Sequence, residues 1–333
     1  MLKAGEIGDG ILIDSTGLPN DAKLQLTGLN NHNGQISLEV RLIYVVQQST
    51  GLPLYYRCVP GNVIDTSTLK RTIAELKAIH INTKFALLDA GYYNGVNADN
   101  LCDAGVSFVS QVHGNHTIFS NALKQYRNIL ESKENLIIHN GRFIYVKECE
   151  VSIGSKGDRK AFGYLCLDTT MQSEGRKMLS LRVTDENMSS NCAFDELQKK
   201  GIFMLVSTRR VAKNNILKLY FTRYKVEEIF KIGKKGGKLL PLCIESEETL
   251  KGHLLMTFIA ASIHKILSDR LLNTNYTVSG VFSLLKHQQA IIYEKELITS
   301  EAVKKMNHLY RAFNMKCPES IPYSATSDEL ARI

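Results

Sequence analysis

The sequence predicts an α/β protein in which a mixed sheet is flanked by helices. Two short apolar runs, GILID at residues 10–14 and FALLD at residues 85–89, read as strands that each end in an acid. Residues 34–46 alternate apolar and polar side chains, which is the period of a half-buried strand. Residues 65–79 carry apolar side chains at helical spacing. With 333 residues, 44% of them hydrophobic, the chain can build one large core or two domains.

The first 112 residues predict a regular order of elements. After the strand at 10–14 and the long strand at 34–46, a turn at 49–51 leads into a returning strand that Pro60-Gly61-Asn62 ends. Asp65 can cap the following helix. The strand at 85–89, a short helix from Asn97 and a strand at 107–112 complete the order. This order is typical of an RNase H-like core, in which Asp14 and Asp89 would end neighbouring strands at one edge.

The rest of the chain predicts three further parts. Residues 113–201 alternate polar loops with short alternating runs, which indicates a mostly β insertion. Residues 202–272 return to the core through a strand at 202–208, one continuous helix over LKLYFTRYKVEEIFKIGKKGGK, and an amphipathic helix at 252–272. Residues 273–333 predict a helical tail with a polar, frayed end. The inward face expected for the helix at 252–272 consists of Leu254, Leu255, Phe258, Ile259, Ile263 and Ile266.

Positive charge is concentrated in one window. Residues 209–238 contain ten Lys or Arg and two acids, so this window alone matches the net charge of +8 of the whole chain. A basic stripe around one helix favours a polyanion partner, DNA or RNA. The alternative is a solvated lysine-rich face.

The cysteines, the histidines and the hydropathy bear on the cellular compartment and on possible metal sites. The seven cysteines form no CxxC pair and suggest thiols in a reducing compartment. His113 and His116 sit in the polar run HGNH, where a plain loop is a better interpretation than a metal site. The first ten residues show no signal peptide, and the longest apolar run, 254–263, is too short to span a bilayer. We expect a cytoplasmic, nucleoid-associated protein with no membrane partner.

Four residues of the predicted helix share one narrow stripe. At about 100° per residue, Tyr220, Arg223, Glu227 and Lys234 fall within roughly 60° of one another. A carboxylate flanked by cations is suited to a phosphodiester-cutting site, because the acid can hold a metal ion and the cations can hold phosphates. The alternative is an ordinary basic amphipathic helix.

The spacing Y-x2-R-x3-E-x6-K resembles the signature of DDE transposases of bacterial and archaeal insertion sequences, of the insertion-sequence-four type. The resemblance extends to the contexts ILIDSTG and LLDAGYYN, the Pro-Gly-Asn break and the long insertion before Glu227. The run LLPLCIESEETLKGHLLMTFIA is similar to the branch of that family with a Gly-His-Leu helix after the catalytic helix.

The resemblance implies a chemistry. Asp14, Asp89 and Glu227 would be the catalytic acids and would bind two Mg²⁺ ions, with Mn²⁺ as a substitute and no organic cofactor. One ion would activate the water that cuts the strand at the element's end, and the freed 3′-hydroxyl would then attack target DNA. Such enzymes are expected to act as homodimers on paired ends.

The resemblance also implies DNA contacts. Tyr220, Arg223 and Lys234 would hold the terminal phosphate and the strand near the cleavage point, and we add Lys231 and Lys235 of the basic window as backbone contacts.

Two departures from the family pattern leave alternatives open. The chain begins about a dozen residues before Asp14, so we expect an N-terminally truncated transposase that lacks the region recognising the inverted repeats. It contains no Trp, so Tyr92, Tyr93 or Tyr224 would have to stack on a flipped base, although plain packing is the better interpretation for each. The alternative functions are a truncated remnant that only binds DNA, an RNase H-like metal-dependent nuclease, and a lysine-rich structural protein.

Overall fold

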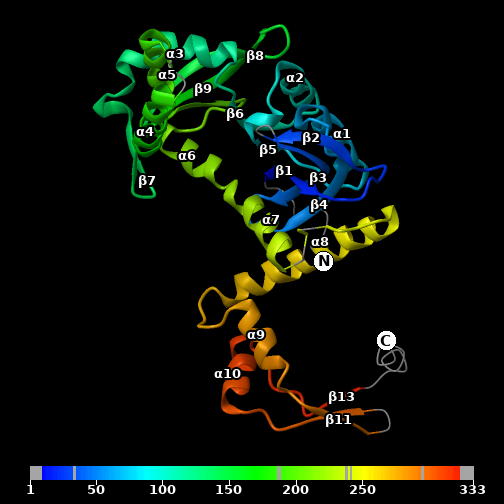
Figure 1. The fold of residues 1–333 in the computed structure, drawn as a ribbon. Coiled ribbons are helices and arrows are strands. Elements are labelled where there is room, and N and C mark those ends of the chain that lie inside the picture. Colours follow the sequence, from blue (N-terminus) through cyan, green and yellow to red (C-terminus); the bar gives the residue numbers. More distant parts are fainter. Residues whose placement is uncertain are drawn as a thin grey trace. The chain divides into compact units, whose positions relative to one another are not determined.

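The computed structural model describes residues 10–32, 35–185, 189–236, 239–240, 242–293 and 296–322. The chain divides into two compact units, the first extending to Phe258 and the second beginning at Ile259 (Figure 1). The first unit contains a large mixed sheet covered by helices, which confirms the α/β class. Within the described residues, no helix is long and apolar enough to cross a membrane.

The large sheet has the strand order β2-β3-β1-β5-β6-β10-β9-β8-β7, and β4 pairs with β3 beside this path. Its first strands are those that the sequence predicted, apart from the short β2, which was missed. The predicted end of β1 at Asp14 is wrong, because pairing with β3 continues the strand to Pro19. The bounds are β1 Ile11–Pro19, β2 Gly28–His32, β3 Gln35–Gln47, β4 Pro53–Pro60, β5 Phe85–Leu88 and β6 Ser107–Val112.

The centre of the sheet is parallel, and its register places the two acids. Strands β1 and β5 run parallel with Ile13 opposite Leu88, and β5 and β6 run parallel with Leu88 opposite Ser110. Asp14 and Asp89 therefore come directly after paired residues of neighbouring strands. The connecting helices are α1 Asp65–Ala78, η1 Ala90–Tyr92 and α2 Gly95–Asp103.

Residues 113–201 extend the same sheet. Strand β10 Ile202–Ser207 pairs antiparallel with β6 and with β9 Arg159–Asp168, which in turn pairs with β8 Arg142–Ile153. Two of these strands, β8 and β9, match the predicted alternating runs. The remaining elements are α3 Thr117–Leu130, η2 Lys133–Asn135, β7 Leu136–His139, α4 Thr169–Asp185 and α5 Ser190–Lys199.

The prediction of a mostly β insertion is wrong, because its three α-helices span more residues than its three strands. The physical reason is composition. Helix α4 carries the run MQSEGRK, whose polar residues suggested a loop although Met, Gln, Glu, Arg and Lys are good helix formers.

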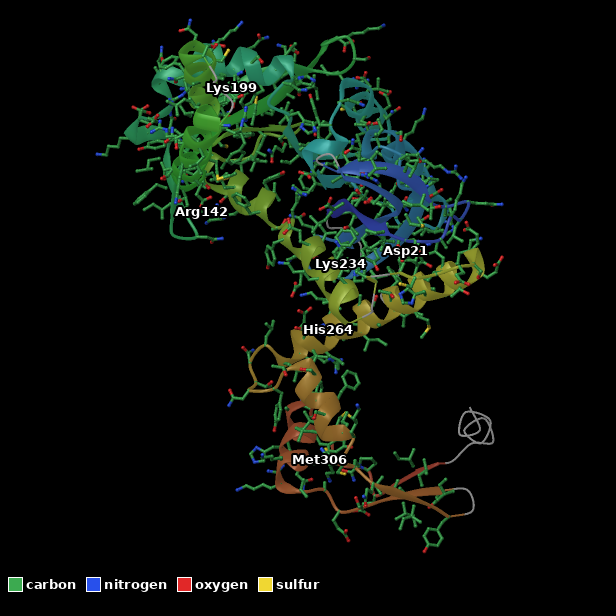
Figure 2. All side chains as sticks on the ribbon, viewed as in Figure 1. Asp21, Arg142, Lys199, Lys234, His264 and Met306 are labelled. Carbon is green, nitrogen blue, oxygen red and sulfur yellow. The ribbon has the colours of Figure 1, made fainter. Side chains whose placement is uncertain are left out.

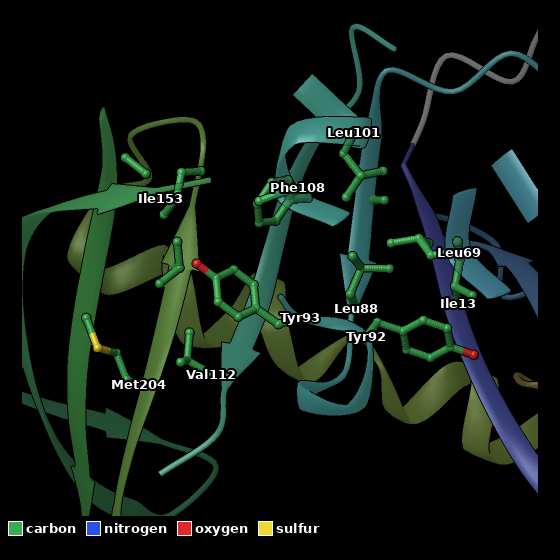
Figure 3. Close-up of a cluster of buried hydrophobic side chains, with 14 of the residues drawn as sticks. Ile13, Leu69, Leu88, Tyr92, Tyr93, Leu101, Phe108, Val112, Ile153 and Met204 are labelled. Atoms are coloured by element: carbon green, nitrogen blue, oxygen red, sulfur yellow. The ribbon is translucent and has the colours of Figure 1, made fainter. Parts of the chain in front are cut away.

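Buried side chains from both halves of the sheet form one core (Figure 3). Tyr92 and Tyr93, which directly follow the strand that ends in Asp89, are among them, with exposed fractions of 0% and 6%. The interpretation of these two tyrosines as packing residues is therefore confirmed, whereas Tyr224 is exposed. Since the core packs against the strands carrying both acids, it fixes the edge at which they lie.

The predicted single helix around the signature is wrong. The structure has α6 Lys213–Phe221 and α7 Tyr224–Gly236, separated by a turn at Thr222 and Arg223. In this turn the amides bond three residues back, for example Arg223 N to Tyr220 O at 3.2 Å and Val226 N to Arg223 O at 3.0 Å. The Thr222 hydroxyl also donates to Leu219 O at 2.7 Å, a side-chain bond to the backbone that bends helices.

Helix α8 Glu247–Leu271 confirms a helix over most of residues 252–272 but only part of its predicted face. Leu254 is buried, and the Phe258 ring lies 5.1 Å from that of Tyr56. The remaining predicted inward residues are exposed: Leu255, Ile259, Ile263 and Ile266. Since apolar residues occupy much of the helix circumference, periodicity alone allowed two different stripes.

The second unit contains strands as well as helices, so the prediction of a helical tail is wrong in part. A small core forms around Leu271, Val278, Val281, Met306 and Leu309. The predicted frayed end, 323–333, lies outside the described residues. The elements are α9 Val278–Leu285, β11 Ala290–Tyr293, β12 Glu296–Thr299, α10 Lys304–Ala312 and β13 Ser320–Pro322, and the three strands pair antiparallel.

Candidate active site

Three polar side chains come together where the parallel pairing of β1, β5 and β6 ends. Asp14 and Asp89 follow the paired Ile13 and Leu88, and Gln111 follows Ser110 in the next strand. Asp14 is 17% exposed and Asp89 42% exposed, so the edge opens to solvent at Asp89. The carboxyl ends of parallel strands meeting at one edge are a common place for a binding site in α/β sheets.

Arg223 joins the two acids. Its Nη2 donates to Asp14 Oδ2 at 3.2 Å, and its Nη1 donates to Asp89 Oδ1 at 2.9 Å. The side chain is 13% exposed, so these ion pairs are largely removed from water. One guanidinium group can contact both carboxylates only if the two acids are close neighbours. The structure thus brings together Asp14, Asp89 and Arg223 as the sequence predicted.

Two further hydrogen bonds, through Tyr220 to Gln111, hold the Arg223 side chain in place. Arg223 Nη1 also donates to the hydroxyl of Tyr220 at 3.0 Å, and that hydroxyl donates to Gln111 Oε1 at 3.1 Å. Burial raises the pKa of Tyr220 above its usual range, which keeps the hydroxyl protonated and able to donate. Sequence reasoning missed Gln111. The available signal was its place at the end of a strand parallel to the one that precedes Asp89.

The environment of Asp14 disfavours its charged form. Burial raises the pKa of its carboxyl to about 6, against the opposing effects of Arg223 and of the Ser15 amide. The Ser15 amide donates to Asp14 Oδ1 at 2.8 Å, so that one oxygen is held by backbone and the other by Arg223. A carboxylate in this setting gains strongly from a nearby cation.

A second acid–arginine pair supports the part of β1 that follows Asp14. The Ser15 hydroxyl donates to Asp65 Oδ1 at 2.6 Å, and Arg41 Nη1 donates to the same oxygen at 2.8 Å. Asp65 lies at the start of α1, where a carboxylate is favourable to the helix dipole. The prediction that Asp65 caps this helix is wrong, because Ile64 is the N-cap residue and Asp65 is the first residue of α1. The Asp65 carboxylate instead anchors Ser15, the residue next to Asp14.

Helix α7 carries Glu227 and Lys234 beside this edge. The helix packs against β1 and β3, and Lys234 Nζ donates to the Thr16 hydroxyl at 2.8 Å, two residues after Asp14 (Lys234 is labelled in Figure 2). Glu227 lies two turns before Lys234, which puts it on the same helical face. Its side chain is exposed.

Glu227 does not complete a group of three acids. Among the residues that the structure describes, no three His, Cys, Asp or Glu side chains lie close enough to hold a metal ion together. Asp14 and Asp89 offer carboxylate oxygens, which are the ligands that Mg²⁺ prefers, and both lie within reach of one guanidinium group. Glu227 would join them only by turning from solvent toward the strand ends.

Two cations of the basic window bind groups of the protein itself, although Arg210 remains exposed. Lys225 Nζ donates to the carbonyls of Gln48 and Ser49, at 2.7 and 2.6 Å, and Arg210 pairs with Glu148 at 2.8 Å. Lys218 and Lys231 are exposed, and the side chain of Lys235 lies outside the described residues.

His116 also has a structural part. Its Nδ1 accepts the Ile118 amide at 3.2 Å at the start of α3, and its ring lies against Tyr93. These contacts support the interpretation of the HGNH run as a plain loop.

Comparisons with known proteins give two similar solved structures and one family model. The chain is 12% identical to the piggyBac transposase of a synaptic complex with hairpin DNA, with a TM-score of 0.44 over 96% of this chain and 60% of that one. It is 11% identical to the Drosophila P element transposase of a strand transfer complex, with a TM-score of 0.19 over 79% of this chain and 51% of that one. The chain thus spans less than two thirds of either. A search among curated proteins found no match. The model of the transposase DDE domain matches residues 6–263, and the chain therefore belongs to the transposase DDE domain family.

Proposed function

We propose that this protein is a DNA transposase with an RNase H-like core, which cuts and joins DNA strands at the ends of an insertion sequence of the insertion-sequence-four type. The observation that carries the proposal is the shared contact of Asp14 and Asp89 with Arg223 where the parallel pairing of β1 and β5 ends. Membership of the DDE domain family supports it. The four-residue signature supports the finer assignment to that type.

Divalent cations, two Mg²⁺ or Mn²⁺ ions, would polarise the phosphodiester and activate the attacking oxygen. Asp14 and Asp89 would hold them through carboxylate oxygens that already lie on one guanidinium. Glu227 would supply the third carboxylate from the face of α7 that Lys234 turns to β1. The Ser15 amide and the Asp65–Arg41 pair would keep the Asp14 carboxyl oriented.

DNA would lie along α7 and the strand edge. Arg223 would reach a phosphate near the cleavage point, because a guanidinium group binds phosphate with two parallel hydrogen bonds. Tyr220, Lys231, Lys234 and Lys235 would contribute further backbone contacts. The protein would act as a homodimer on paired ends, in the cytoplasm and in association with the nucleoid.

Strand transfer tests the proposal. Inverted repeats in the DNA flanking the gene supply candidate ends, which are offered pre-nicked with a free 3′-hydroxyl and a 5′ label on the same strand, with Mg²⁺ and a supercoiled target plasmid. Joined products that require Mg²⁺ are the expected result.

The alternative functions predict other outcomes. A nuclease of the same core would cut without joining, and a remnant would shift the labelled DNA in a gel without altering it. Either outcome would contradict the proposal.

A further inference from the structure

Arg223 contacts one oxygen of each carboxylate that would hold a metal ion. Asp14 Oδ1 is engaged by the Ser15 amide, so Oδ2, which Arg223 holds, is the oxygen left for a cation. Asp89 Oδ1 is likewise held by Arg223. A divalent cation between the two carboxylates would meet the guanidinium at short range, and like charges in a largely buried site repel strongly. The arginine and the metal therefore compete.

The arginine is not fully satisfied where it lies. Its Nε is buried and has no hydrogen-bond partner among the described residues. A buried donor without a partner is costly. A phosphate could take Nε and one Nη together, in the two-pronged geometry that guanidinium groups favour.

The backbone around Arg223 suits a side chain with two positions. The residue lies in the turn between α6 and α7, where the amides bond three residues back, and such a break in a helix often marks a functional hinge. The Tyr220 hydroxyl, which is bonded to Gln111, can keep its hydrogen bond from Arg223 while the guanidinium group moves away from the acids.

We propose that Arg223 is an exchangeable counter-ion that couples metal binding to DNA binding. It neutralises Asp14 and Asp89 until a DNA phosphate takes its guanidinium, and the freed carboxylates then bind the divalent cations. The inference rests on the proposed function and adds a regulation to it: the metal site forms fully only when DNA is present. By linkage, the cations must favour DNA binding by the same factor.

Mn²⁺ affinity is the direct readout. The wild-type chain, freed of metal with a chelator, is titrated with Mn²⁺ while free Mn²⁺ is followed by electron paramagnetic resonance, with and without a 20-base-pair duplex of arbitrary sequence. We expect the duplex to tighten the Mn²⁺ affinity of the wild type at least tenfold.

Arg223→Gln should bind Mn²⁺ at least tenfold more tightly than the wild type without DNA and gain less than threefold from the duplex. Arg210→Gln is the matched control, because Arg210 is an exposed arginine of the same basic window that pairs with Glu148. It should keep the wild-type affinity and the wild-type coupling. Should Arg223→Gln fold poorly, the charge-preserving Arg223→Lys should retain the competition but lose part of the coupling, since an ammonium group cannot take a phosphate in the same two-pronged way.

The outcomes separate the two ideas. If Arg223→Gln binds Mn²⁺ no more tightly than the wild type, or keeps the full effect of DNA, the counter-ion role is overturned while the active site stands. If Asp14→Asn combined with Asp89→Asn leaves Mn²⁺ affinity unchanged, the cation does not bind at these acids and the proposed function itself fails.

Discussion

The Nη1 atom of Arg223 lies 2.9 Å from Oδ1 of Asp89, although 134 residues separate them in the chain. This contact joins the signature at the α6–α7 junction to the edge of the parallel sheet. It shows that the signature arginine belongs to the same site as the first two acids. The arginine therefore bears on the electrostatics of the acids as well as on DNA.

The acids give the first prediction. Asp14→Asn, Asp89→Asn and Glu227→Gln should each abolish Mg²⁺-dependent cleavage, because each removes a negative charge that would hold a cation. DNA binding should remain within about threefold of wild type, since phosphate contacts come from the cations. Cleavage of a labelled duplex and a fluorescence-anisotropy titration measure the two properties separately.

Glu248→Gln is the matched control for Glu227→Gln, because Glu248 is also an exposed glutamate but lies in α8 instead of α7. It should cut normally. Wild-type cleavage by Glu227→Gln would show that this exposed carboxylate has no part in the reaction.

The end of β5 was predicted well because the signal is local: the apolar run stops at Leu88, and Asp89 follows it. The end of β1 was predicted wrongly, because β1 continues past Asp14 to Pro19 by pairing with β3, and only its parallel pairing with β5 stops at Ile13. Gln111 could not be singled out in the same way. Its importance depends on the Tyr220 hydroxyl, which reaches it across 109 residues.

Other features depended on competition between nearly equal choices. Residues 213–236 have helical spacing throughout, but bonding of the Thr222 hydroxyl to Leu219 and the pull of Arg223 toward the acids favour a break. In α8, the choice between Leu254 and Leu255 as the buried stripe depends on which partner surface the helix meets. Tertiary contacts determine both the helix break and the buried stripe, and the periodicity of the sequence carries no information about those contacts.

Salt dependence tests the DNA contacts. Arg223→Ala and Lys234→Ala should each weaken DNA binding and make its dependence on salt shallower, by about 0.9 in the slope of log K against log[salt] for each lost phosphate contact. For Lys234 the effect should be smaller if its hydrogen bond to Thr16 persists with DNA bound. Anisotropy titrations at several salt concentrations give both slopes.

Lys77→Ala is the control for this series, since Lys77 is exposed on α1, outside the basic window. Its slope should equal the wild-type slope. A wild-type slope for both Arg223→Ala and Lys234→Ala would mean that DNA binds another face.

The pKa of Asp14 gives a prediction for pH. Burial raises it to about 6, above the ordinary value of about 3.9 for an unfolded chain. The protonated carboxyl therefore favours folding, and this contribution is present below about pH 4 and is lost as pH rises through about 6. In the presence of a chelator, the loss of this contribution should lower the free energy of unfolding of the wild type by about 1–3 kcal/mol between pH 4 and pH 7. Urea unfolding of wild type and Asp14→Asn at both pH values isolates it.

Two comparisons sharpen the pH experiment. With the 20-base-pair duplex in every sample, Mg²⁺ at pH 7.5 should restore stability to the wild type but not to Asp14→Asn, because the cation replaces the proton at this carboxyl. Asp99→Asn should have the opposite effect on the pH dependence of stability. The hydrogen bonds from Ser155 lower the pKa of Asp99, so its contribution to the wild type is lost on acidification, and the variant lacks this loss. An identical pH dependence for wild type and Asp14→Asn would rule out a raised pKa at this site.

Two glycines of the predicted motifs should respond in opposite directions to the same substitution. Gly61, in the Pro-Gly-Asn break, is buried, and a Cβ there would lie 2.6 Å from the backbone oxygen of Glu39 and 2.9 Å from its carbonyl carbon. Backbone of a central strand cannot yield cheaply, so Gly61→Ala should lower the free energy of unfolding by about 1–3 kcal/mol. Gly252 of α8 meets nothing within 4 Å, and Gly252→Ala should raise it by about 0.5–1 kcal/mol through helix propensity. Urea unfolding measures both variants, and a stabilising Gly61→Ala would mean that the close approach of the break to β3 is not as the structure has it.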